Sequence, residues 1–346
     1  MTAADNTMEF SKRLLSVLLI EKSLSAQMRI KVEAQAMHMV QHLTADAGDF
    51  LHYDLDADLH TEEEVKTLID AFPSALSQIR LYDYGSDDDE PIELLPIQAA
   101  GWNHDGRNCI PFIPLLAEEG RKLNVGGEGK RGGLILKDNP DGENVLQELA
   151  RIESSADDST SLHVLKRLRE SDLLKKEDIR QYDLLWYSCK SQAKERFEYF
   201  IYWDPEALKE YQCRGDPLLQ ANTCGIIDHF AMALKAGLKY YPEELGFLFR
   251  KNGEGETALK LAFERYGKGE AWRAIEKCFE ETRDVKMVER NPTTNMYPFM
   301  LATLASAGET SELNTMYFLL RRDPIVFDRV ADGFAESKRS RQTQPS

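Results

Sequence analysis

Hydrophobic residues recur along the chain at the three- and four-residue spacing of helices that are buried on one side. In residues 226–234 the apolar positions 226, 227, 230 and 234 form such a stripe, and Gly225 and Gly237 bracket it. We interpret this segment as the second helix of a helix pair. Comparable second helices are expected over residues 112–119, 162–169, 271–280 and 313–322. The pattern predicts a chain made largely of short helices.

A second pattern, a six-residue core, precedes these helices. Its best copy is Thr257-Ala258-Leu259-Lys260-Leu261-Ala262, in which Thr257 can cap a helix and the apolar residues can face a core. Other copies begin at Leu95, Asn144, Asp216 and Tyr297, with a fainter one at Tyr182. Leu and Tyr side chains cannot cap, so the first and last copies should begin less firmly. The copies recur at intervals of between about 34 and 49 residues, which suits one helix pair for each interval.

A third pattern ends several of the helices. We call it the exit motif: an aromatic residue or Asp, then Pro, then Leu or Phe three residues after the Pro. Copies begin at Phe72, Asp204, Tyr241 and Asp323. Proline cannot continue a helix, so the motif predicts that each helix stops there and that the following Leu or Phe packs back onto the core.

Together these patterns predict an all-α fold, a helix-pair solenoid over residues 61–332. Residues 1–60 are expected to form an N-terminal helical cap, with an amphipathic helix from Glu9 to about His42. Residues 333–346 are basic and polar, and we expect this tail to be disordered.

Two segments, residues 215–237 and 253–279, resemble ankyrin repeats, with a Pro-Leu or Ala-Leu core, a Leu-rich second helix and flanking glycines. The resemblance covers residues 61–330 in a divergent form, like the irregular ankyrin-like proteins of some unicellular algae. One departure is systematic, because the family's core histidine is replaced in five copies: Gln98, Gln147, Leu219, Lys260 and Met300. The hydrogen-bond ladder of ankyrin stacks should therefore be absent, and a HEAT-like or tetratricopeptide-like solenoid stays open.

The resemblance implies a non-catalytic scaffold that binds a protein partner on the concave face of the stack. The ankyrin contact positions fall on Trp102, Asn103, His104, Arg214, Thr223, Glu256, Arg265, Tyr266, Asn295 and Ser306. Trp, Tyr and Arg dominate interface energies, so Trp102, Arg265 and Tyr266 are the strongest candidates.

The charge narrows the choice of partner. The chain has 43 Lys and Arg against 59 Asp and Glu, a formal net charge of −16. This charge opposes nucleic acid and anionic membranes and favours a basic protein partner.

The apolar run of residues 14–20 is too short to span a bilayer. The five cysteines form no C-x-x-C pair, and their odd number suits a reducing compartment, so we expect a cytoplasmic or nuclear location. We also expect a monomer.

Catalytic and cofactor motifs are weak. The pairs Cys109 with His104 and Cys224 with His229 leave open a cysteine-dependent enzyme whose helices frame a pocket. The glycine-rich residues 126–131 lack the spacing and the Ser or Thr of a phosphate loop, and His38 with His42 has no third ligand. We therefore expect no cofactor and no metal. A third option is an adaptor that docks through the basic residues 338–341.

Overall fold

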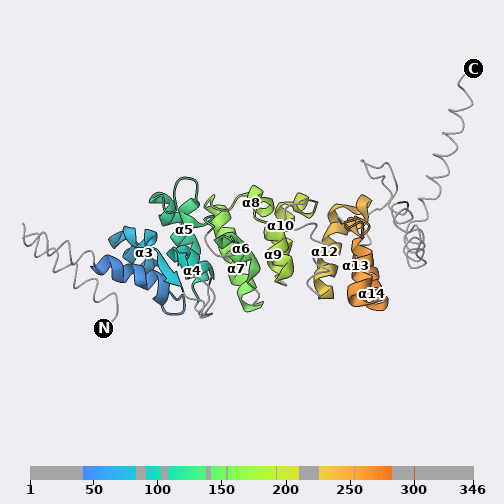
Figure 1. Ribbon diagram of the computed structural model, residues 1–346, viewed down its shortest axis with the longest axis horizontal. Coiled ribbons are helices and arrows are strands. Elements are labelled where there is room, and N and C mark those ends of the chain that lie inside the picture. The colour runs from blue at the N-terminus through green and yellow to red at the C-terminus, as the bar shows by residue number, and fades with distance from the viewer. Residues whose placement is uncertain are drawn as a thin grey trace, which may run out of the picture. The chain divides into compact units, whose positions relative to one another are not determined.

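The computed structural model describes residues 42–82, 91–102, 108–137, 142–152, 155–191, 193–209, 226–252, 254–282 and 300. The chain divides into two compact units, Met1–Lys175 and Lys176–Ser346, and most of the described residues in both are helical (Figure 1). The predicted helix from Glu9 lies outside the described residues up to its end at His42, and the basic tail lies outside them entirely. Residues 42–60 belong to the first unit.

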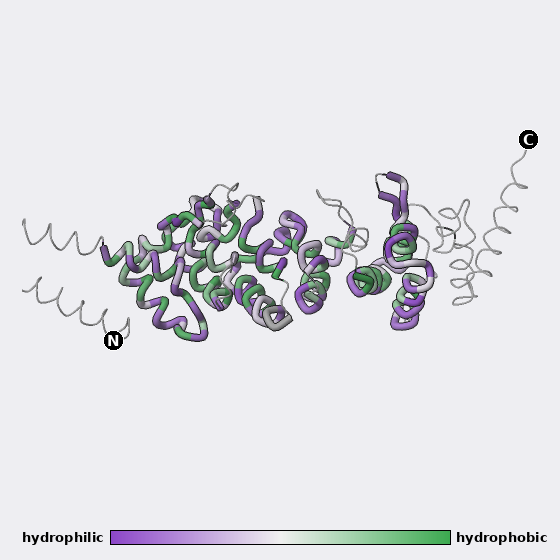
Figure 2. Tube along the Cα trace, turned by 60° about the horizontal axis from the view of Figure 1, so that its bottom comes forward, coloured by the Kyte–Doolittle hydropathy of each residue, from purple (hydrophilic) through white to green (hydrophobic). Residues whose placement is uncertain are grey.

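The described part of the first unit begins with helical residues 42–49 and contains one short hairpin. Its elements are η2 (Phe50–Asp54), α3 (Glu62–Ala71), η3 (Pro73–Ser77), β1 (Arg80–Tyr82), β2 (Ile92–Leu94), α4 (Pro96–Trp102), η4 (Ile110–Phe112), α5 (Ile113–Lys122), η5 (Arg131–Gly133), α6 (Val145–Arg151) and α7 (Ser155–Glu170). Strands β1 and β2 are antiparallel, with Tyr82 opposite Ile92. Hydrophobic and hydrophilic stretches alternate along the trace of this unit (Figure 2), and its buried hydrophobic residues form the core.

The described residues of the second unit form helices and turns, with no strand beyond an isolated bridge between Lys251 and Thr257. Its elements are α8 (Lys176–Gln181), α9 (Leu184–Lys190), α10 (Lys194–Trp203), η6 (Pro205–Leu208), α12 (Ile227–Tyr240), η7 (Pro242–Phe247), α13 (Ala258–Tyr266) and α14 (Lys268–Glu281).

The six-residue cores mark the starts of first helices, as predicted. The side chain of Asn144 accepts hydrogen bonds from the N–H groups of Leu146 and Gln147 at the start of α6, and Thr257 accepts one from Lys260 at the start of α13. At the faint copy, α9 begins one residue late, after Asp183 in the left-handed region. The copies that begin at Asp216 and Tyr297 lie outside the described residues, apart from Met300.

The glutamines at the fourth position of two six-residue cores have a local role. Gln98 accepts a hydrogen bond from the N–H of Leu95 at 2.7 Å, and Gln147 accepts one from the N–H of Asn144 at 2.9 Å. Each side chain thus reaches back over the first turn of its own helix and satisfies a donor that has no helical partner. The bond that Gln98 accepts also supports the start of α4, because the side chain of Leu95, which precedes this helix, cannot cap it.

Four of the five predicted second helices are confirmed. Residues 112–119, 162–169, 226–234 and 271–280 lie in α5, α7, α12 and α14, apart from Phe112 and Ile226, which immediately precede α5 and α12; residues 313–322 lie outside the described part of the chain. Helix α10 was not among these predictions.

The exit motif is confirmed in the three copies that the structure describes. Pro73, Pro205 and Pro242 each begin a 3₁₀ turn directly after a helix, at η3, η6 and η7. The residue three positions after each Pro is buried: Leu76, Leu208 and Leu245. The fourth copy, at Asp323, lies outside the described residues.

Corresponding helices pack side by side within each unit. In the first unit α4 contacts α6 and α5 contacts α7, and in the second unit α12 contacts α14. Fully buried leucines, isoleucines and phenylalanines fill the spaces between them, among them Leu146, Leu149, Ile113, Phe230 and Ile275. In the first unit the first helix α4 thus contacts the first helix α6, and in both units second helices contact second helices.

Candidate binding site

Three aromatic side chains from separate elements of the first unit form a cluster that includes the predicted contact residue Trp102. The rings of Tyr53 and Tyr82 have centroids 5.5 Å apart, and the ring of Trp102 meets Tyr82 edge to face at 5.9 Å. Tyr53 is 42% exposed, while Tyr82 and Trp102 are half-buried. We call these three residues the aromatic cluster.

The hairpin explains why residues so far apart in sequence meet. Strand β1 ends in Tyr82, and β2 leads through Leu95 directly into α4, whose last residue is Trp102. Helix α4 also contacts η2, which carries Tyr53. Three elements thus converge at one end of the hairpin.

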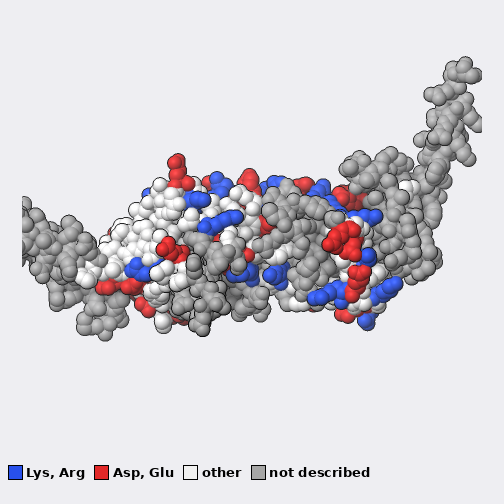
Figure 3. Space-filling view, in the orientation of Figure 1, with Lys and Arg blue, Asp and Glu red and all other residues white. Residues whose placement is uncertain are grey.

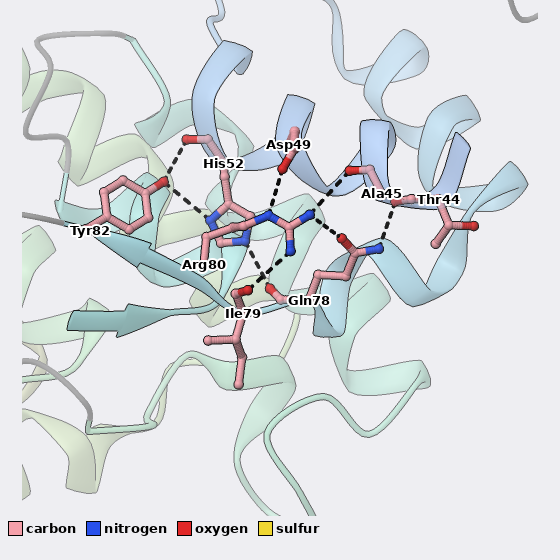
Figure 4. A network of polar contacts seen from close by, with 8 residues as sticks. All are labelled: Thr44, Ala45, Asp49, His52, Gln78, Ile79, Arg80 and Tyr82. Carbon is pink, nitrogen blue, oxygen red and sulfur yellow. Dashed lines mark hydrogen bonds and ion pairs between the residues drawn. The ribbon is translucent and has the colours of Figure 1, made fainter. Parts of the chain in front are cut away.

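A buried histidine holds Tyr82 in place (Figure 4). The Nε2–H of His52 donates to the carbonyl oxygen of Gln78 at 2.9 Å, while the Tyr82 hydroxyl donates to the His52 carbonyl oxygen at 2.9 Å and lies 3.3 Å from Nδ1. Burial lowers the pKa of His52 to about 4, so its imidazole is neutral at pH 7. The neutral ring can therefore donate through Nε2 and accept at Nδ1.

Arg80 and Gln78 connect the hairpin to the helical residues before η2, as Figure 4 shows. Arg80 donates to the Asp49 carboxylate at 2.6 Å and to the Gln78 side-chain oxygen at 2.8 Å. The Gln78 amide in turn donates to the Thr44 carbonyl oxygen at 2.8 Å. These bonds position β1, and with it Tyr82, against residues 42–49.

The other described contact candidates lie in the second unit. Asn252 accepts hydrogen bonds from the N–H groups of Glu254 and Glu256, which closes a turn before α13, and Glu256 pairs with Lys260 at 2.9 Å. Arg265 is exposed. Tyr266 is less available than its sequence position suggests, because its hydroxyl donates to the Ile226 carbonyl oxygen at 3.3 Å and its ring faces Phe230.

These candidates do not form one cluster. Glu256 precedes the nine-residue helix α13 and Arg265 lies at its far end, so their backbones are about 12 Å apart along the axis. The remaining candidates lie outside the described residues: Asn103, His104, Arg214, Thr223, Asn295 and Ser306.

Sequence reasoning missed Tyr53 and Tyr82. The available signal was a pair of short alternating runs, residues 79–82 and 92–94, on either side of the acidic residues 83–90. Such runs around a polar loop are typical of a hairpin.

The described cysteines are free and buried: Cys109, Cys189 and Cys278. The thiol of Cys109 donates to the Leu55 carbonyl oxygen at 2.8 Å. Burial raises the pKa of Cys278 to about 12, so its thiol stays protonated at pH 7. The partners suggested for a catalytic pair, His104 with Cys109 and Cys224 with His229, each include one residue outside the described part of the chain.

Within the described ranges, no helix is both long and apolar enough to cross a bilayer, and no group of three or more His, Cys, Asp or Glu side chains is arranged to hold a metal ion. No protein-family model matches the chain, and no significant match was found among curated proteins or solved structures.

Proposed function

We propose that the chain is a non-catalytic scaffold of ankyrin-like helix pairs that binds a basic segment of a protein partner. The packing of first helices on first helices and of second helices on second helices supports the repeat part of this proposal, since stacked repeats bury their apolar faces in this way. Three copies of the exit motif, each of which begins a 3₁₀ turn at its Pro directly after a helix, support it further.

The observation that carries the binding part is the aromatic cluster. Large aromatic side chains that are only partly buried and held rigid by their neighbours contribute binding energy at little entropic cost. Tyr82 is fixed by His52, and Trp102 is fixed by its edge-to-face contact with Tyr82. Tyr53 offers the most exposed ring face.

Charge favours a basic segment. The exposed Asp54 follows Tyr53 directly, and the exposed Asp58 lies on the turn that follows. An Arg or Lys side chain can stack on an aromatic face while its charge lies near a carboxylate. Positive and negative side chains both lie on the face shown in Figure 3, so the net charge of −16 gives only a general bias toward basic partners. The carboxylates of Asp54 and Asp58 set the local preference for a basic segment.

Peptide binding tests this proposal directly. Fluorescence anisotropy with an array of Arg- and Lys-containing 12-residue peptides should identify binders whose affinity falls at least tenfold in Tyr53→Ala and falls with added salt. Leu81→Ala is the matched control, because Leu81 is 61% exposed on the same hairpin but outside the cluster. Equal affinities in the two variants, or equal binding of acidic peptides, would reject the site.

The alternative of a cysteine-dependent enzyme has weaker support. The described thiols are buried, and a thiol with a pKa as high as that of Cys278 is a poor nucleophile at neutral pH. Rapid alkylation of one thiol at pH 7 in the folded chain would favour the enzyme. The cytoplasmic location and the monomeric state stay predictions.

A further inference from the structure

A hollow of about 810 Å³ opens between α10, α12 and α14 of the second unit. Its lining is mixed, and the apolar part comes from Phe197 and Ile201 of α10, Ala231 and Met232 of α12, and Ala274 of α14. This volume lies within the range of small-molecule sites, which are mostly apolar with a few placed polar groups.

A buried imidazole without a partner lines this hollow. His229 is 2% exposed, and within the described part of the chain neither of its ring nitrogens has a hydrogen-bond partner. A neutral imidazole carries one donor and one acceptor, and leaving buried polar groups unpaired is destabilising. A ligand that brings a hydroxyl or carbonyl group to His229 would remove this cost.

Lysines from all three helices line the same hollow. Lys194, Lys235 and Lys277 are exposed, and the Lys235 ammonium pairs with Glu281 at 2.7 Å. Hydrogen bonding from Lys235, aided by the charges of Lys277 and Lys194, lowers the pKa of Glu281. Three ammonium groups thus act on one carboxylate.

The lining of the hollow does not share the acidic charge balance of the chain. Counting also Lys239, Glu198 and Asp228, the lining has four lysines and three carboxylates, whereas the whole chain has a net charge of −16. A partly apolar hollow with one more lysine than carboxylates, in an otherwise acidic protein, favours an anion with an apolar body.

We propose that this hollow binds a small amphipathic anion, with its carboxylate or phosphate at the lysines, its apolar body along the helices and a hydroxyl or carbonyl group at His229. The spacing along α12 sets the length of such a ligand. His229 and Lys235 are six residues apart, about 9 Å along the helix axis. This site is separate from the aromatic cluster, and neither proposal depends on the other.

Three probes of equal chain length separate the contribution of the negative charge from that of the hydroxyl group. Isothermal titration calorimetry on the full chain should rank 8-hydroxyoctanoate above octanoate, and octanoate above 1,8-octanediol. Inorganic phosphate alone should compete at least tenfold more weakly than octanoate. Equal binding of the charged and uncharged probes would overturn the proposal, and so would phosphate competing as well as octanoate.

Variants then place the probes in the hollow. Ala274→Phe fills the space and should weaken 8-hydroxyoctanoate at least tenfold, whereas Lys260→Gln, outside the hollow, should leave binding unchanged. His229→Leu should abolish the advantage of 8-hydroxyoctanoate over octanoate and leave the circular dichroism spectrum as it is. Undiminished binding in Ala274→Phe, or a hydroxyl advantage that survives in His229→Leu, would show that the probes bind elsewhere.

Discussion

Gly237 on α12 lies against Gly246 in η7 so closely that a Cβ atom on Gly237 would sit 2.6 Å from the Gly246 carbonyl oxygen. Gly246 itself has a φ of +60°, and a Cβ atom there would lie 2.7 Å from the backbone nitrogen of Leu238. Neither position has room for a side chain, because the atoms that would clash belong to the backbone.

The first unit contains the same arrangement. A Cβ atom on Gly120 of α5 would lie 2.9 Å from the carbonyl oxygen of Gly132 in η5, and Gly132 has a φ of +70°. In both units three consecutive residues around the second glycine have positive φ, and a fully buried leucine follows, Leu134 or Leu248. Two segments with little sequence in common thus follow one backbone course, which supports an internal repeat.

Alanine at the helical glycines should therefore destabilise each unit. We expect Gly237→Ala and Gly120→Ala each to lower the free energy of unfolding by about 1–3 kcal/mol, because the backbones must move apart. Urea denaturation followed by circular dichroism measures this.

Gly269 is the matched control for those two substitutions. It lies in α14, and a Cβ atom there would meet nothing within 4 Å. Gly269→Ala should leave stability unchanged or raise it by up to about 1 kcal/mol, because alanine favours helix. A loss in Gly269→Ala equal to that in Gly237→Ala would show that the close crossing is not the cause.

Neighbouring exit motifs should contribute to stability through a direct contact. The hydroxyl of Tyr241 donates to the Glu206 carboxylate at 3.0 Å, and the Lys209 ammonium lies over the Tyr241 ring at 4.1 Å. In a double-mutant cycle, Tyr241→Phe and Glu206→Gln should show a coupling energy of about 0.5–1.5 kcal/mol. Strict additivity of the two substitutions would mean that this contact does not hold η6 and η7 together.

Two buried carboxyls of the first unit should respond to pH in opposite directions. Burial raises the pKa of Glu148 to about 7, although Arg151 donates to it at 2.7 Å. The unfolded chain ionises this group near pH 4.5, so the folded state loses about 3 kcal/mol from it as pH rises from about 4.5 to 7. Glu148→Gln should therefore stabilise the protein at pH 8 and have little effect at pH 4.

Glu119 serves as the comparison for Glu148. Hydrogen bonding from Lys122, and from Lys66 at 3.3 Å, lowers the pKa of Glu119, so its contribution is present above the unfolded pKa and lost in acid. Glu119→Gln should destabilise the protein at pH 7 and have little effect at pH 2. Urea titrations at each pH measure both variants, and shifts of the same sign would contradict this assignment.

Local chemistry explains which parts of the fold the sequence predicted. Asn144 and Thr257 cap helices through bonds that span only two or three residues, and Pro205 stops a helix through its own ring, so each signal can be read from a short window. The glycine crossing could not be read in this way. Gly132 and Gly246 have different neighbours, and only the backbone angles reveal their equivalence.

The candidate site was predictable only in part for the same reason. Trp102 could be placed by its position in the repeat, but its neighbours Tyr53 and Tyr82 reach it through a hairpin of three-residue strands. Strands this short carry little periodic signal. Tyr266 shows the converse, since its repeat position predicted a contact residue and the bond to Ile226 turns it toward α12.

Acid should disrupt the aromatic cluster through His52. Because burial lowers its pKa to about 4, the unfolded chain takes up a proton on this residue near pH 6.5, while the folded chain does so only near pH 4. The stability that depends on neutral His52 is thus complete above pH 6.5, and about 3 kcal/mol of it is lost as pH falls to 4. His52→Gln, whose side-chain amide can still donate to the Gln78 carbonyl oxygen, should flatten the loss of stability between pH 6.5 and 4 in urea titrations. His163→Gln, an exposed histidine on α7, should leave that slope as it is. If the two variants show the same slope, protonation of His52 is not what limits the first unit in acid.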